Sequence, residues 1–162
     1  MILRGLSMTG NAPSSEPDLA ALIFQVLPRL GALEEPILRD AGLSMWEYAI
    51  LTEVASGAAM SQRELSRRTR RDPTRLGRHL DDLVSRGLVN RAKSRDQRQR
   101  TVEISADGHT LLNEVRGKIR SVEDELLRAG LSESEGGQFR RLLARLAASC
   151  EGVAAEESKP SG

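Results

Sequence analysis

The chain has 162 residues, 39% of them hydrophobic and 29% charged, which is the composition of a folded globular protein large enough to bury one core. Aromatic residues make up only 2%, too few for the row of stacked rings that binds single-stranded nucleic acid. The sequence has one cysteine and no apolar run of the roughly 20 residues that a membrane span needs. It therefore predicts neither a disulfide framework nor a membrane span, and we expect a cytoplasmic protein.

Charge is distributed unevenly along the chain. Residues 61–100 contain 13 lysines and arginines against 5 acidic residues, whereas the rest of the chain has 11 basic and 18 acidic residues. The net charge of +1 therefore hides one strongly basic segment. Such a segment is typical of a surface that binds a polyanion, and the alternative is a charged face that meets only solvent.

The first predicted helix covers residues 18–39, after a leader (1–17) that we expect to be disordered. Its apolar residues recur at the three- and four-residue intervals of one helix face. Pro28 and Pro36 predict kinks or a break within this helix, and Gly42 allows a turn after it.

Three further helices begin at recognisable capping residues. Ser44 and Ser61 each stand three residues before a glutamate, which is the spacing of a capping box, and a helix is predicted after each of them. Asp72 followed by Pro73 predicts the start of a helix at 73–86, because aspartate is a favoured N-cap and proline a favoured first helical residue.

The helix at 73–86 has an apolar side and a polar side on a helical wheel. The apolar side holds Leu76, Leu80 and Leu83, and the polar side holds Thr74, Arg75 and Arg78. Arginine and threonine can both bond base edges in a major groove, which the polar side would suit. With the short helix at 62–68, this predicts a helix-turn-helix in which Arg71 is placed to contact phosphate. The alternative is an ordinary amphipathic helix whose arginines lie in water.

Two short strands, 88–93 and 100–105, follow and predict a β-hairpin. The sequence RAKSRDQRQR, residues 91–100, holds five cations and one acid, with apolar residues on either side of it. We expect the apolar ends of the hairpin to pack on the core, while the charged middle contacts phosphates or enters a minor groove, where arginine is favoured. A helix-turn-helix followed by a basic hairpin is a winged helix.

Two helices are predicted after the hairpin, at 106–128 and 133–150, followed by a tail (151–162) that we expect to be disordered. Cys150 continues the apolar stripe of the last helix, which favours a buried structural thiol over a redox sensor. Met45, Trp46 and Tyr48 are assigned to the core in preference to an effector pocket. Two histidines are too few for a persuasive zinc site, and we expect no metal, no cofactor and no catalysis.

Residues 87–108, GLVNRAKSRDQRQRTVEISADG, resemble the wing of the MarR family of bacterial transcriptional regulators. The likeness lies in the order Asp96, Arg98, a short apolar strand, Ser105 and Gly108. It implies a homodimer in which the first and the last two helices pair across a two-fold axis. It also implies that Thr74 and Arg78 read bases, that Arg98 is the wing-tip arginine, and that Asp96 orients a wing arginine.

Together these expectations describe a mainly α protein with a small β wing, a winged helix-turn-helix at about 44–105 and dimerisation helices at about 18–40 and 106–150. We interpret it as a regulator, a repressor in the first instance, that binds a pseudo-palindromic duplex and takes a small-molecule effector as a further partner. The alternatives are a winged helix that binds RNA or protein, and a redox regulator that uses Cys150. The predicted DNA-contacting residues are Arg71, Thr74, Arg75, Arg78, Lys93, Arg95, Asp96 and Arg98.

Overall fold

The structure is a computed structural model that describes residues 17–57, 59–93 and 100–157. It is mainly helical with one small antiparallel sheet, as expected. The elements in chain order are α1 (Leu19–Asp40), α2 (Met45–Ala55), β1 (Met60–Ser61), α3 (Gln62–Thr69), α4 (Pro73–Ser85), β2 (Val89–Lys93), β3 (Arg100–Ile104), α5 (Ala106–Arg128) and α6 (Glu133–Glu157).

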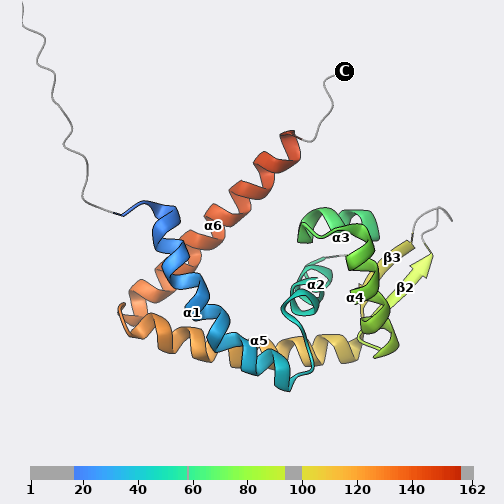
Figure 1. Cartoon of the computed structure of the whole chain (residues 1–162), viewed down its shortest axis with the longest axis horizontal. Coiled ribbons are helices and arrows are strands. Elements are labelled where there is room, and N and C mark those ends of the chain that lie inside the picture. Colours follow the sequence, from blue (N-terminus) through green and yellow to red (C-terminus); the bar gives the residue numbers. More distant parts are fainter. Residues whose placement is uncertain (1–16, 58, 94–99, 158–162) are drawn as a thin grey trace, which may run out of the picture.

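The elements form two groups joined by the long helix α5 (Figure 1). Helices α2, α3 and α4 and the hairpin gather at the end of α5 where that helix begins, and α1 packs along α5. Helix α6 starts from the other end of α5 and projects away from it (Figure 1). None of the described helices is both long enough and apolar enough to cross a membrane.

The predicted helix starts are confirmed in atomic detail. Ser44 and Glu47 form a reciprocal capping box, in which the Glu47 N–H donates to Ser44 Oγ over 3.2 Å and the Ser44 N–H donates to Glu47 Oε2 over 2.7 Å. Ser61 Oγ accepts from the Glu64 N–H over 3.1 Å. Asp72 caps α4 by accepting from the N–H groups of the second and third helical residues, with Pro73 in the first position.

The sheet has the order β1-β3-β2, so β3 lies between two antiparallel neighbours. Val89 pairs with Ile104 and Arg91 with Val102 in the hairpin, while Met60 pairs with Val102 on the other side of β3. The hairpin confirms the predicted one, but β1 was not predicted, because two residues are too short to display an alternating pattern.

The core lies between the winged helix and the first half of α5. The apolar side of α4 is fully buried in it, as predicted. The other fully buried side chains come from α2, α3, the hairpin and α5, and include Ile50, Leu51, Leu65, Val89, Val102, Leu112 and Val115.

The first helix is found as predicted, and of the kinks or break expected at Pro28 and Pro36 the break is absent, because α1 runs from Leu19 to Asp40 without interruption. Pro28 and Pro36 lack the N–H groups that would bond the carbonyls of Phe24 and Ala32. All four of these residues are exposed, so water can satisfy the two carbonyls and the helix continues.

The two terminal helices carry large apolar side chains that the other described residues leave exposed. Every residue from 19 to 29 and from 141 to 150 is exposed. The large apolar residues among them and at Phe139 are Leu19, Leu22, Ile23, Phe24, Val26, Leu27, Leu142, Leu143 and Leu146.

The last helix also corrects two expectations. Cys150 is exposed, not buried, because the second half of α6 extends beyond the helices on which its apolar stripe would have to pack. Helix α6 continues to Glu157, seven residues past the expected boundary, and residues 158–162 lie outside the described residues.

Candidate nucleic-acid interface

A tight turn joins α3 to α4 and gives the pair the form of a helix-turn-helix. Arg70 ends α3 in the left-handed region, at φ +49°. The next residue is held from both sides, because the Arg71 N–H donates to the Ser66 carbonyl over 3.1 Å and Ser66 Oγ donates to the Arg71 carbonyl over 2.6 Å. The turn is thus closed by α3 itself before Asp72 starts the next helix.

The polar side of α4 is available for a ligand. Thr74, Arg75 and Arg78 are exposed and lie opposite the buried leucines. Among the described residues, the guanidinium groups of Arg75 and Arg78 have neither a hydrogen-bond partner nor an ion-pair partner. These two cations keep their full charge and donor capacity for an external acceptor.

Neighbouring arginines on α3 are held by protein carboxylates instead. Glu64 accepts from Arg67 Nη2 over 2.6 Å and from Arg68 Nε over 2.9 Å, and Arg68 also lies 3.6 Å from Glu53. The hydrogen bonds from Arg67 and then Arg68 lower the pKa of Glu64 to about 2. The positive charge at this end of α3 is therefore partly neutralised within the protein.

Arg71 contacts a side chain of α2. Its guanidinium carbon lies 4.0 Å from the centre of the Trp46 ring, within the range of a cation–π contact. Its Nε is buried and has no hydrogen-bond partner among the described residues. The side chain thus packs on α2 in the free protein, and its contact with phosphate stays a prediction.

The assignment of the first residues of α2 to the core is wrong for two of three side chains. Met45 and Trp46 are exposed at 45% and 39%, because the first turn of α2 precedes the part of the helix that faces the core. Tyr48 is half-buried and packs against the core as expected.

The wing is described up to its base. Lys93 pairs with Arg100 at the last described position of the hairpin. Arg95, Asp96 and Arg98 lie outside the described residues, so their roles stay predictions.

Arg91 joins the hairpin to α4, a role that was not predicted from the sequence. Arg91 forms an ion pair with Asp81 and its Nη2 donates to the Gly77 carbonyl over 3.4 Å. A signal for this was present in the sequence: Arg91 stands two residues after Val89 in a strand, which places both on the same face, toward the core. The neighbouring Asp82 instead pairs with Arg86 over 3.2 Å.

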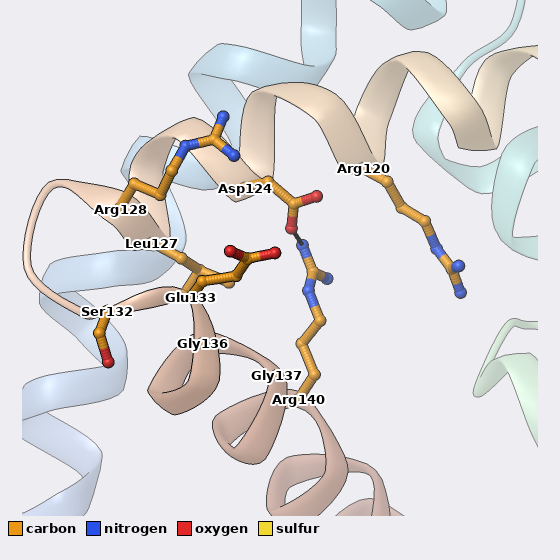
Figure 2. A pocket seen from close by; sticks show the side chains of 9 residues that line it. All are labelled: Arg120, Asp124, Leu127, Arg128, Ser132, Glu133, Gly136, Gly137 and Arg140. Atoms are coloured by element: carbon orange, nitrogen blue, oxygen red, sulfur yellow. Dashed lines mark hydrogen bonds and ion pairs between the residues drawn. The ribbon is translucent and has the colours of Figure 1, made fainter.

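A pocket of about 410 Å³ lies at the elbow between α5 and α6. Figure 2 shows the guanidinium of Arg140 directed at Asp124. Arg140 also bonds Glu123 over 2.6 Å, so two carboxylates of α5 already compensate its charge. Within the described ranges, no three histidine, cysteine or acidic side chains are grouped so that they could hold a metal ion.

The helix-turn-helix, the sheet and the exposed basic side of α4 define the class of winged helix-turn-helix proteins. The sequence model of the MarR family matches residues 41–100. That segment, from the end of α1 to the start of β3, is similar to the winged helix-turn-helix of the MarR family, which confirms the resemblance inferred from the wing motif.

Solved structures extend the likeness of fold beyond this segment. Apo MarR from E. coli has a TM-score of 0.69 at 22% identity, covering 81% of this chain and 98% of its own. NadR in complex with 4-hydroxyphenylacetate has a TM-score of 0.66 at 24% identity, covering 84% and 96%. The F27L mutant of S. aureus MepR bound to an oligodeoxyribonucleotide has a TM-score of 0.58 at 17% identity, covering 83% and 99%. Among curated protein sequences there is no match to this chain.

Proposed function

We propose that the chain is a transcriptional regulator that binds double-stranded DNA in the cytoplasm. Helix α4 enters the major groove, where Thr74 and Arg78 meet base edges and Arg75 meets phosphate or base. The observation that carries this is the exposed polar side of α4, on which two arginines have no partner among the described residues while their neighbours on α3 are paired. The relative crystallised on an oligodeoxyribonucleotide supports the same ligand.

The acting species is a homodimer that joins through α1, α5 and α6. The single chain exposes apolar side chains along the first half of α1 and along α6, and contiguous apolar surface of this kind marks a protein–protein contact. A two-fold axis would cover both helices at once and present two copies of α4 to a pseudo-palindromic operator. The domain at 18–150 then includes its own dimerisation helices.

In its simplest form the bound dimer represses by occupying the operator. A small molecule that binds one spacing of the two α4 helices better than the other would shift the dimer between DNA-binding and non-binding states. NadR with its bound 4-hydroxyphenylacetate is a precedent in this fold for a small aromatic ligand.

Selection of bound duplexes from a random pool tests the function directly. We expect one enriched pseudo-palindromic sequence, bound at least about 1,000-fold more tightly than random duplex at physiological salt. Arg78→Ala should reduce that ratio, while the variant Arg68→Ala, which removes an arginine already paired with Glu64 and Glu53, is the matched control. Equal affinity for all duplexes, or tighter binding to RNA, would contradict the proposal.

The exposure of Cys150 gives the redox alternative a specific observation, because an oxidant can reach an exposed thiol. Peroxide treatment of the protein on its operator separates the two cases. Release of DNA from the parent but not from Cys150→Ser would favour a redox regulator, and equal behaviour of both proteins would favour the ligand-responsive one.

A further inference from the structure

We propose that Arg91 is a positioning residue that fixes the wing against the recognition helix α4, and that it thereby determines which flanking base pairs the wing can read. The inference rests on the proposed function and deepens it. Arg91 acts here through its contacts with α4 and not by touching DNA.

The contacts of Arg91 reach across from the hairpin to two successive turns of α4. Its Nη1 bonds Asp81 and its Nη2 donates to the Gly77 carbonyl over 3.4 Å. Gly77 and Asp81 are four residues apart on the helix and so lie on one face of it. The planar fork of the guanidinium can contact two acceptors in a fixed relative orientation, which a lysine ammonium cannot reproduce.

Arg91 is also desolvated for a residue of its type. Its side chain is 22% exposed, against 68% for Asp81, and its Nε is buried without a hydrogen-bond partner among the described residues. A guanidinium that has given up this much water is tied to the acceptors it has left, because moving away from them would leave it buried and unpaired. An exposed ion pair lacks that constraint and contributes little.

The position of Arg91 along the strand explains what it can control. The hairpin leaves α4 through Gly87, at φ +71°, and Val89 is buried in the core. These two residues hold the strand at its base. Arg91 lies two residues farther toward the tip and adds a second attachment, which prevents the wing from swinging about the turn.

On DNA, α4 and the wing would meet the duplex at two separate places, so the angle between them sets which flanking step the wing reaches. Loss of the second attachment would leave α4 in its groove but spread the wing over several positions. The core half-site would still be read, and discrimination among flanking sequences would fall.

The test uses the full-length protein and duplexes with one selected core and either A·T-rich or G·C-rich flanks. The variants are Arg91→Lys, which keeps the charge, and Asp81→Asn, which changes an exposed side chain. Asp82→Asn is the matched control, since its carboxylate pairs with Arg86 and not with the hairpin. Affinity for each duplex is measured at several salt concentrations.

We expect Arg91→Lys and Asp81→Asn to bring the ratio of affinities for the A·T-rich and G·C-rich flanks (the flank ratio) at least halfway to one. The ratio of affinities for the selected core and random sequence should stay within about 2-fold of the parent. The dependence of affinity on salt should not change for Arg91→Lys. The double variant Asp81→Arg with Arg91→Asp should recover part of the flank ratio, and Asp82→Asn should match the parent.

Three outcomes would overturn the inference. The ratio of affinities for the two kinds of flank could be unchanged in both variants, or the parent could bind its selected core without any flank preference. Arg91→Lys could also weaken binding to all duplexes alike while Asp81→Asn matches the parent, which would make Arg91 a phosphate contact. A parent that prefers no duplex at all would instead refute the proposed function.

Discussion

Gly108 in the first turn of α5 packs directly against the main-chain carbonyl of Leu88. A Cβ atom at this position would overlap the Leu88 oxygen and would lie 2.8 Å from Cγ1 of Ile104. The same oxygen accepts from the Ser105 N–H over 3.0 Å, and Ser105 Oγ caps α5 at the Gly108 N–H over 2.9 Å. The glycine therefore lets α5 begin against the base of the wing.

We expect Gly108→Ala to destabilise the protein by about 3 kcal/mol, at the upper end of overpacking costs, because the main-chain atoms of the hairpin cannot rotate away as a side chain could. Gly117→Ala is the control on the same helix, where an added Cβ meets nothing within 4 Å. That variant should gain about 1 kcal/mol from helix propensity. Denaturant unfolding of both variants and the parent checks the prediction. A Gly108→Ala variant as stable as the parent would contradict the close contact between Gly108 and Leu88.

Arg78→Ala should weaken binding to the selected operator by about 1–3 kcal/mol and relax the preference at one base pair in each half-site. The reason is that an arginine which contacts a guanine contributes to one sequence more than to others. Anisotropy titrations with operator and random duplexes give the measurement. If both duplexes weaken equally, Arg78 contacts phosphate and the base-reading assignment is wrong.

Phe24→Asp or Leu146→Asp should shift the protein from dimer to monomer at micromolar concentration. Both side chains are large, apolar and exposed in the single chain, at 75% and 47%, so the changes should spare the monomer fold but place a charge in the proposed interface. Ser56→Asp adds the same charge at an exposed position after α2, outside the helices proposed to dimerise, and should stay dimeric. Light scattering with circular dichroism tests this, and a parent that is monomeric yet binds its operator tightly would rule out the dimer.

The cations of the wing should separate by role. Lys93→Ala and Arg95→Ala should weaken all duplexes alike, and each should reduce the slope of log affinity against log salt by about 0.9 if its cation neutralises one phosphate. Arg98→Ala should instead lose preference for A·T-rich flanks, and Asp96→Ala should do so in part. Affinities for both kinds of flank, measured at several salt concentrations, distinguish the two roles. An unchanged flank ratio in Arg98→Ala would mean that the wing makes electrostatic contacts only.

Features that depend on a few neighbouring residues could be predicted from the sequence. The N-caps at Ser44, Ser61 and Asp72 are local, since a side chain bonds backbone two or three residues away, and each was found. The buried stripe of α4 and the hairpin follow from periods of 3.6 and 2 in the same way. These local signals were sufficient to reach the winged helix.

Features that depend on contacts between distant residues could not be predicted in the same way. Arg71 and Trp46 are 25 residues apart, and Arg91 and Asp81 lie in different elements. No local sequence pattern therefore predicts these contacts. Their effect on the site is large, because pairing decides which arginines remain available to a ligand. The exposure of Cys150 depends likewise on what lies beside α6, which its own apolar stripe does not reveal.

The junction of α1, α5 and α6 contains two carboxyl groups that affect each other. Glu34 of α1 is half-buried, and its pKa is raised above the usual value, first by that burial and then by the charge and a hydrogen bond of Glu123. Glu123 in turn bonds Arg140 of α6, which also holds Asp124. Arg140 thus bonds two acidic groups, Glu123 and Asp124, while Glu34 interacts with Glu123 alone.

The raised pKa gives the effect of Glu34 on stability a definite sign. The folded state holds the Glu34 proton more tightly than the unfolded state does, so this group favours folding at pH values below 4.5, the ordinary value for glutamate. That contribution is lost as the pH rises through 4.5 and then through the raised pKa of the folded state. At pH 7 the ionised Glu34 therefore costs stability.

We expect Glu34→Gln to raise the Tm at pH 7, because the amide removes the repulsion from Glu123 but leaves the bonds of Glu123 and Asp124 to Arg140 in place. The gain should shrink to nothing by about pH 4, where the parent is already protonated at this position. Glu35→Gln is the control, since Glu35 is exposed and lies 3.8 Å from Arg39, a separation at which an ion pair contributes little. Thermal unfolding of the three proteins between pH 4 and 8 measures this, and a Tm for Glu34→Gln that falls below the parent at pH 7 would mean that the ionised carboxylate stabilises the junction.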